Sequence, residues 1–329
     1  MRALAGDTPL QSEEWVRRNE PLGLHCRPVA CEIGSAEGQI GMNAEEFDIQ
    51  TVVVVGAGAM GHGIAQVAAS AGFDVVLSDV SREAVEAGLA RVRDNLDRGV
   101  ARGKVSERER DDCLAHLHGE PDLRIAASQA DLLIEAVPES AELKRGIFTL
   151  AAETAPARAI FATNTSSIPL AQLCRAVPRP AQFVGLHFFN PVHLQPLLEI
   201  VRAADTSSET LDRALAFAQR IGKDPIVVKD IAGFASSRLG IALGLEAIRM
   251  VQDGVASAAD IDKAMELGYR HPMGPLKLTD LVGLDVRLAI AQTLADEIDP
   301  VRFAPPQLLR DLVAAGKLGK KSGEGFYKY

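Results

Sequence analysis

The stretch IQTVVVVGAGAMG, residues 49–61, decides the expected fold of this chain. Its β-branched first half is typical of a strand that is buried on both faces of a sheet. Its second half matches the pattern G-x-G-x-x-G, and residues 60–71 continue at helical spacing until Gly72 ends the helix. Such a loop makes a tight turn and lets backbone N–H groups approach a pyrophosphate. The predicted loop contacts to a dinucleotide are Gly56, Gly58, Ala59, Met60 and Gly61.

Asp79 indicates which dinucleotide binds. It ends the second predicted strand, residues 74–79, and lies 23 residues after Gly56. A carboxylate at this point accepts hydrogen bonds from ribose hydroxyls and repels a 2′-phosphate, and the following Val80 and Ser81 supply no basic side chain. The sequence therefore predicts NAD in preference to NADP. The competing interpretation is a structural glycine turn in a fold that binds no nucleotide.

The rest of the chain alternates strands and helices as far as residue 230. Helical spacing covers residues 81–101, and Ser106 with Glu109 has the pattern of a capping box. This alternation predicts an α/β fold, a Rossmann-type doubly wound parallel sheet. After residue 230 only helical patterns follow, which predicts an all-helical second domain. Further strands are expected at residues 132–134, 160–162, 183–186 and 225–228, and further helices at 240–251, 257–267, 284–298 and 305–315.

The expected domains are residues 49–230, which bind NAD, and residues 231–329, which bind substrate and dimerise. Residues 1–48 have neither helical nor strand periodicity. We expect them to be a disordered extension, or upstream sequence that is not translated, with Met42 as the true start.

Composition and charge narrow the class of partner. The 329 residues are 47% hydrophobic and 24% charged, which is the balance of a folded globular protein. The net charge of −9 gives a nucleic-acid partner no electrostatic support, so an anionic ligand requires a local basic pocket. The sequence has no run of eighteen or more apolar residues, so it predicts no membrane span. Four cysteines without metal-ligand spacing, and no secretory signal pattern, predict a cytoplasmic protein without a metal site.

Polar residues follow two of the predicted strands. Residues 164–167, Asn-Thr-Ser-Ser, come directly after the strand at 160–163, and His187 comes directly after the strand at 183–186. Glu199 lies 12 residues further on, in an apolar run. The ends of parallel strands meet at one edge of a sheet, where a histidine and a serine suit proton transfer to or from a hydroxyl.

At these residues the sequence resembles the L-3-hydroxyacyl-CoA dehydrogenase family, with the short-chain 3-hydroxybutyryl-CoA dehydrogenases the most similar in length. The resemblance covers residues 49–329 and implies an all-α C-terminal domain like that of 6-phosphogluconate dehydrogenase. Unrelated Rossmann dehydrogenases share only the glycine loop, so these motifs are specific. They are residues 164–167, GLHFFNP at 185–191, MGP at 273–275, DLVGLD at 280–285 and GKKSGEGFY at 319–327.

The resemblance implies an NAD-dependent oxidation of (S)-3-hydroxyacyl-CoA thioesters. It makes His187 the general base, Glu199 the carboxylate that orients it, and Ser166 the hydroxyl that holds the substrate oxygen. A carboxylate on one imidazole nitrogen fixes the tautomer and stabilises the imidazolium that forms when the other nitrogen takes a proton. Without the resemblance, His187 would more often be a structural histidine. Further implied cofactor contacts are Glu139, Lys144, Ser166, Asn190 and Lys321.

Ser237 departs from the family pattern. The family has asparagine before the arginine of its Gly-Phe-x-x-Asn-Arg segment, where it helps to polarise the substrate carbonyl, and this chain has GFASSR at residues 233–238. A serine hydroxyl is shorter but still donates one hydrogen bond, directly or through water. We therefore expect Ser237 to contact the substrate, with a consequence for rate or substrate choice.

A basic patch after the second strand predicts where CoA binds. Arg98, Arg102 and Lys104 can pair with CoA phosphates, or they can be the solvated end of a helix. Lys144 and Lys321 have the same alternative of a solvated surface lysine. The competing functions are a dehydrogenase of a free hydroxy acid, as in the L-gulonate 3-dehydrogenases, which would not need the patch, and an inactive NAD-binding protein. The family also implies a homodimer through the helical domain.

Overall fold

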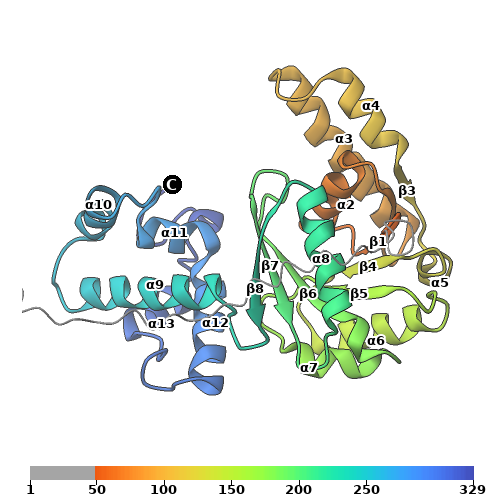
Figure 1. Ribbon diagram of the computed structural model, residues 1–329. Helices are drawn as coiled ribbons and strands as arrows, with labels where there is room; N and C mark the ends of the chain where they lie inside the picture. Colours follow the sequence, from red (N-terminus) through yellow and green to blue (C-terminus); the bar gives the residue numbers. More distant parts are fainter. Residues whose placement is uncertain (1–48) are drawn as a thin grey trace, which may run out of the picture. The chain divides into compact units, whose positions relative to one another are not determined.

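The computed structural model describes residues 49–329. The expectations for the N-terminal extension, Met42 included, lie outside these residues. One eight-stranded sheet has the order β3-β2-β1-β4-β5-β6-β7-β8 (Figure 1). The strands are β1 Thr51–Val55, β2 Asp74–Ser78, β3 Leu117–Gly119, β4 Leu132–Glu135, β5 Ile160–Thr163, β6 Phe183–Phe188, β7 Leu197–Arg202 and β8 Asp224–Lys229.

Helices cover both faces of this sheet because β1 is apolar on both sides. Val52 and Val54 pack with one set of helices, and Val53 and Val55 pack with the other. The first set is α2 Gly61–Ser70, α3 Arg82–Ala101, α4 Glu107–Ala115 and α8 Ser208–Arg220. The second set is α5 Leu123–Ala127, α6 Ala141–Ala152 and α7 Leu170–Leu173, with 3-10 turns at Cys174–Ala176 and Pro180–Gln182. The predicted doubly wound α/β fold is confirmed.

The predicted capping box is also confirmed: the Ser106 hydroxyl accepts from the Glu109 N–H, and the Glu109 carboxylate accepts from the Ser106 N–H. It begins α4, which with α3 forms a helical hairpin that extends past the sheet in Figure 1.

One strand pair departs from the expected parallel sheet. β7 is antiparallel to β6, and β8 is parallel to β7. The connection from β6 to β7, residues 189–196, is too short for the crossover of a dozen or more residues that a parallel pair needs. The sequence pattern missed β7 as a strand and also missed the short β3.

The chain after β8 is helical, and a separate apolar core holds it together. Ile241, Leu245 and Ile248 on the first long helix bury one face against the other helices of this core. The pattern missed α11, whose run of eight residues is short. The helices are α9 Ser236–Gln252, α10 Ala258–Gly268, α11 Pro275–Val282, α12 Leu284–Glu297 and α13 Gln307–Ala314, with a 3-10 turn at Lys320–Ser322.

Within residues 49–329 no helix combines the length and the apolar character that a membrane crossing requires. The same residues contain no cluster of three or more histidine, cysteine or acidic side chains placed to hold a metal ion.

Candidate active site

The glycine loop connects β1 to α2 in a conformation that only its glycines permit. Gly56 has φ +102°, and a Cβ there would lie 2.7 Å from the Ala136 carbonyl oxygen. A Cβ at Gly61 would overlap the carbonyl group of Gly56. A Cβ at Gly58, by contrast, would meet no atom within 4 Å. The middle of the loop is therefore open on the side from which a ligand can reach the backbone.

Asp79 braces this loop from the end of β2. One carboxylate oxygen accepts from the Ala57 N–H at 2.6 Å, and the other accepts from the Val80 N–H at 2.7 Å. Arg91 on α3 donates to the Ala57 carbonyl at 2.7 Å. The helix that follows has no side-chain cap on its first N–H groups. An open loop, uncapped N–H groups and a fixed carboxylate fit a dinucleotide with its pyrophosphate over Gly58.

His187 and Glu199 are opposite each other on β6 and β7. The antiparallel pairing places these two residues in register, and His187 Nδ1 lies 2.7 Å from Glu199 Oε2. Directly opposite side chains share one face of a sheet, so the strand pairing itself forms the contact. The His187 ring also packs against Phe189 and Phe234, at centroid distances of 4.6 and 5.6 Å. His187 lies within β6, not just after it as the pattern predicted.

Glu199 is fully buried and accepts four hydrogen bonds. Besides His187, the Ala235 and Ser236 N–H groups donate to Oε1 at 3.2 and 2.8 Å, and the Ser236 hydroxyl donates to Oε2 at 2.9 Å. Burial raises the pKa of Glu199, but the hydrogen bonds from His187 and Ser236 and the attraction of His187 outweigh it, so the pKa is lowered. The carboxylate is therefore held charged beside the imidazole.

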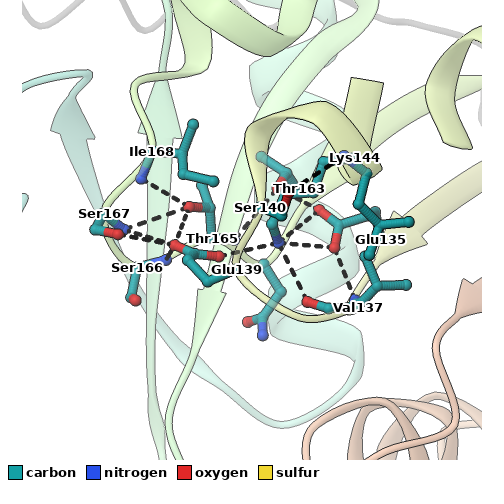
Figure 2. Close-up of polar contacts among 12 residues, drawn as sticks. Glu135, Val137, Glu139, Ser140, Lys144, Thr163, Thr165, Ser166, Ser167 and Ile168 are labelled. Carbon is teal, nitrogen blue, oxygen red and sulfur yellow. Dashed lines mark hydrogen bonds and ion pairs between the residues drawn. The ribbon is translucent and has the colours of Figure 1, made fainter. Parts of the chain in front are cut away.

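Figure 2 shows how Glu139 holds the loop that carries Ser166. One Glu139 oxygen accepts from the Ser166 and Ser167 N–H groups, each at 3.1 Å, and from the Thr165 hydroxyl. Burial raises the pKa of Glu139, but the charge of Lys144 and the hydrogen bonds from Thr165, Lys144 and Ser167 lower it overall. Within residues 49–329 the Ser166 hydroxyl donates to no other group, so it is available to a ligand.

Lys144 is buried, which overturns the alternative of a solvated surface lysine. Its side chain is 1% exposed, and its ammonium lies 2.7 Å from Glu135 and 3.1 Å from Glu139. Glu135 ends β4 and is itself fully buried. Its other oxygen accepts from the Thr163 hydroxyl at 2.7 Å. Through this chain of contacts the ends of β4 and β5 fix the Ser166 loop.

The other predicted site residues occupy different surroundings. Ser237 is half-buried in the first turn of α9, directly after the Ser236 that contacts Glu199. Asn190 is exposed in the loop after β6. Lys321 forms an ion pair with Asp285 on α12 at 2.6 Å and has no described contact with the other predicted cofactor residues.

Arg98, Arg102 and Lys104 line one cavity of about 1180 Å³. Its wall also includes Arg220 from the end of α8 and His193 from the loop after β6, with the acidic Glu109 and Asp112 of α4 at one side. Burial and the neighbouring charges of His62, Lys223 and Arg98 lower the pKa of His193. The three predicted residues therefore form part of a locally basic pocket in an acidic protein.

The sequence pattern missed three residues that support the site. Glu135 pairs with the buried lysine, the Asn164 side chain accepts from the Phe188 N–H at 2.9 Å, and Ser236 donates to Glu199. Asn164 belongs to the Asn-Thr-Ser-Ser motif at residues 164–167, but nothing in the sequence indicates its hydrogen bond from the end of β5 to β6. An acidic residue at the end of an apolar strand was the available signal for Glu135.

The fold and site define the class of an NAD-dependent dehydrogenase with a Rossmann-type sheet. Residues 51–231 match the family described as "3-hydroxyacyl-CoA dehydrogenase, NAD binding domain", and residues 233–329 match "3-hydroxyacyl-CoA dehydrogenase, C-terminal domain". The chain belongs to the 3-hydroxyacyl-CoA dehydrogenase family, as the sequence motifs indicated, and is an NAD-dependent oxidoreductase of that class.

The similarity to named relatives extends over nearly the whole length of each relative. The chain is 43% identical over 276 residues to the probable 3-hydroxybutyryl-CoA dehydrogenase of Deinococcus radiodurans, which spans 84% of this chain and 99% of the relative. Among solved structures, FadB2 of M. tuberculosis has a TM-score of 0.82 at 44% identity, covering 86% of this chain and 99% of that chain. The (S)-3-hydroxybutyryl-CoA dehydrogenase PaaH1 of Ralstonia eutropha has a TM-score of 0.83 at 39% identity, with the same coverage.

Proposed function

We propose that this enzyme oxidises short (S)-3-hydroxyacyl-CoA thioesters, 3-hydroxybutyryl-CoA among them, with His187 as the general base. The observation that carries the proposal is the His187–Glu199 pair, whose charged carboxylate occupies Nδ1 and leaves Nε2 for the substrate. The names of the relatives support the short acyl chain.

In this mechanism the Ser166 hydroxyl binds the substrate 3-oxygen, and His187 Nε2 accepts the proton that leaves it. Glu199 stabilises the imidazolium that results, because its negative charge lies 2.7 Å from Nδ1. NAD, held at the glycine loop and Asp79, would supply the acceptor for the hydride that leaves C3. Phe189 and Phe234, which contact the imidazole, limit water around the base.

The cofactor is proposed to lie over the glycine loop with its ribose hydroxyls at Asp79. Gly56, Gly58, Ala59, Met60 and Gly61 would lie against its pyrophosphate, and Glu139 holds the loop of Ser166, which would lie at the nicotinamide end. Lys144 supports the same part of the site indirectly, because its ammonium pairs with Glu139. Asn190 and Lys321 stay predicted contacts.

The basic cavity is proposed to hold the phosphates of CoA. An Arg102→Gln variant is expected to raise the KM for acetoacetyl-CoA about three- to tenfold at low salt, with a smaller effect at high salt, because a phosphate loses a charged donor that solvent screens. Initial-rate kinetics at two ionic strengths measure it. Arg93→Gln, an exposed residue of the same helix outside the cavity wall, is the control. Equal KM values in both variants and wild type would place CoA elsewhere.

The same cavity argues against a free hydroxy acid as the substrate, since such a substrate has no use for Arg98, Arg102 and Lys104 at one wall. The intact His187–Glu199 pair argues against an inactive NAD-binding protein.

A homodimer through the helical domain is part of the proposal. Several large apolar side chains are exposed on its helices or directly after one, as at surfaces that a partner covers. They are Leu239, Leu267, Tyr269, Leu281, Val282 and Val286. A cytoplasmic location is proposed as well, since Cys113 and Cys174 are free and buried.

A substitution of Ser237 is expected to raise the activity, whereas most substitutions in a catalytic site lower it. Ser237→Asn is expected to raise kcat with acetoacetyl-CoA by up to about 100-fold, because it supplies a longer donor where the substrate carbonyl is expected. Steady-state kinetics beside Ser237→Ala measure it. If the alanine variant equals wild type and the asparagine variant is no faster, position 237 does not contact the carbonyl.

The proposed function is tested by NADH-linked reduction of acetoacetyl-CoA, run beside NADPH and beside free acetoacetate. Turnover is expected with NADH and the thioester only. Turnover of acetoacetate with equal kcat/KM would support the free-acid alternative, and no turnover with bound NADH would support the inactive one.

A further inference from the structure

Two carboxylates share one ammonium at the end of β4. Both oxygens of Glu135 contact Lys144 Nζ, at 2.7 and 3.0 Å, and Glu139 lies 3.1 Å from the same nitrogen (Figure 2). Within residues 49–329 no other cation pairs with either carboxylate. These three side chains are here called the acidic triad. Two negative charges and one positive charge leave it with a net charge of −1.

The other partners of the acidic triad carry no charge. Glu135 accepts from the Val137 N–H and the Thr163 hydroxyl, each at 2.7 Å. Glu139 accepts from N–H groups and hydroxyls of the loop that carries Ser166. Such neutral donors stabilise ionised carboxylates without cancelling their charge. The excess negative charge of the triad therefore remains in the folded protein.

The acidic triad lies between the glycine loop and the loop of Ser166. A Cβ added at Gly56 would lie 3.0 Å from the Val137 nitrogen, which is the nitrogen that donates to Glu135. At the other end, Glu139 accepts from the Ser166 N–H at 3.1 Å. Short contacts thus join each end of the triad to one of the two loops along which the cofactor is proposed to lie.

Only one end of the acidic triad is accessible. The side chains of Glu135 and Lys144 are 0% and 1% exposed, whereas that of Glu139 is 36% exposed. Solvent and salt screen a buried charge much less than an exposed one. A ligand that covers Glu139 would therefore experience the charge of the whole triad, and not that of one solvated carboxylate.

We propose that the acidic triad shifts the cofactor affinity of this enzyme toward NAD and away from NADH, and that the fully buried Glu135 controls this shift. The inference deepens the proposed function and rests on its placement of the nicotinamide end beside Ser166. The nicotinamide ring carries a positive charge in NAD and none in NADH. A net negative charge nearby stabilises the charged form and has little effect on the neutral one. Glu135 acts through its neighbours, because without its charge the remaining pair of Lys144 and Glu139 is neutral.

The test measures the dissociation constants of NAD and NADH by isothermal titration calorimetry. Glu135→Gln keeps the shape of the side chain and removes its charge. It is expected to raise the ratio of the Kd for NAD to the Kd for NADH about three- to tenfold, almost entirely through weaker NAD binding. Adding Lys144→Met restores a net charge of −1, because only Glu139 stays charged, and is expected to restore most of the wild-type ratio. If Glu135 only maintained the shape of the site, both Kd values would rise together, and the unchanged ratio would overturn the inference.

Asp131→Asn is the matched control. Asp131 is also buried and directly precedes β4, four residues before Glu135, so about 13 Å of extended chain separates the two acids. The variant removes the same charge at the opposite end of the strand and is expected to keep the wild-type ratio. An equal shift of the ratio in Asp131→Asn and Glu135→Gln would also overturn the inference, since it would reflect the charge of the whole protein.

Glu139→Gln is the second variant, and it decides the matter if Glu135→Gln does not fold. It leaves the buried pair of Glu135 and Lys144 intact and neutral, and it is expected to raise the ratio by at least as much. An unchanged ratio in either folded variant would overturn the inference, even if both forms of the cofactor bind more weakly. Failure of the wild type to bind either form would reject the proposed cofactor site and this inference together. Binding without turnover of acetoacetyl-CoA would reject the proposed activity alone, and the Kd ratios would still decide the inference.

Discussion

A His187→Gln enzyme is expected to reduce acetoacetyl-CoA with a kcat lower by about 10³-fold, within the range that general acid–base catalysis contributes. Glutamine has a similar length and can still donate to Glu199, so the cross-strand contact and the buried carboxylate stay satisfied. What it lacks is a basic ring nitrogen that can exchange a proton with the substrate oxygen. The loss should therefore be in kcat, with little change in the KM for either substrate.

The measurement is steady-state kinetics, with NADH binding followed in the same preparation to show that the fold is intact. His118→Gln, an exposed histidine on β3, is the matched control and should retain wild-type activity. Retention of more than about a tenth of wild-type kcat in His187→Gln would contradict the role of His187, since a general base contributes at least 10²-fold.

Lys144→Met is expected to lower the free energy of unfolding by about 3–5 kcal/mol, because it leaves Glu135 charged, buried and without its cation. The pair is almost completely buried, at 1% and 0% exposure, so solvent cannot replace the ammonium. Lys317→Met breaks a pair of which about two fifths is exposed on both sides, and should lower it by less than about 1 kcal/mol.

Urea unfolding of both variants measures the difference, and a double variant identifies its cause. Glu135→Gln combined with Lys144→Met removes both charges, so it should recover at least about 1 kcal/mol of the loss. Additive effects of the two substitutions would mean that the contacts of each residue with other groups, such as Thr163 and Glu139, dominate over their mutual attraction.

The glycine loop, the alternation of strands and helices, and the helical second domain were predictable from local pattern alone. The G-x-G-x-x-G pattern after an apolar run is typical of the turn from a strand into a helix, and capping residues such as Ser106 mark helix starts directly. The direction of β7 was not predictable in this way. Its residues suit either direction, and the length of the connection after β6 decides the pairing.

The residues of the site were likewise predictable in part, whereas the contacts between them were not. His187 and Glu199 are both visible in the sequence, but their contact depends on the register of an antiparallel pair. The burial of Lys144 was not predictable, because a lysine in the first turns of a helix usually reaches solvent. It depends on the contact with Glu135, which only the three-dimensional structure shows.

From β7, Glu199 also satisfies the start of α9, since it accepts from the N–H groups of Ala235, the N-cap residue, and Ser236. The nucleotide-binding domain and the helical domain are thus not interchangeable modules. A recombinant that joins residues 49–230 to an unrelated helical partner would keep the glycine loop but would lose three of the four donors that hold the carboxylate. We therefore expect the two domains to evolve together, with the segment 233–237 retained alongside the strand that carries Glu199.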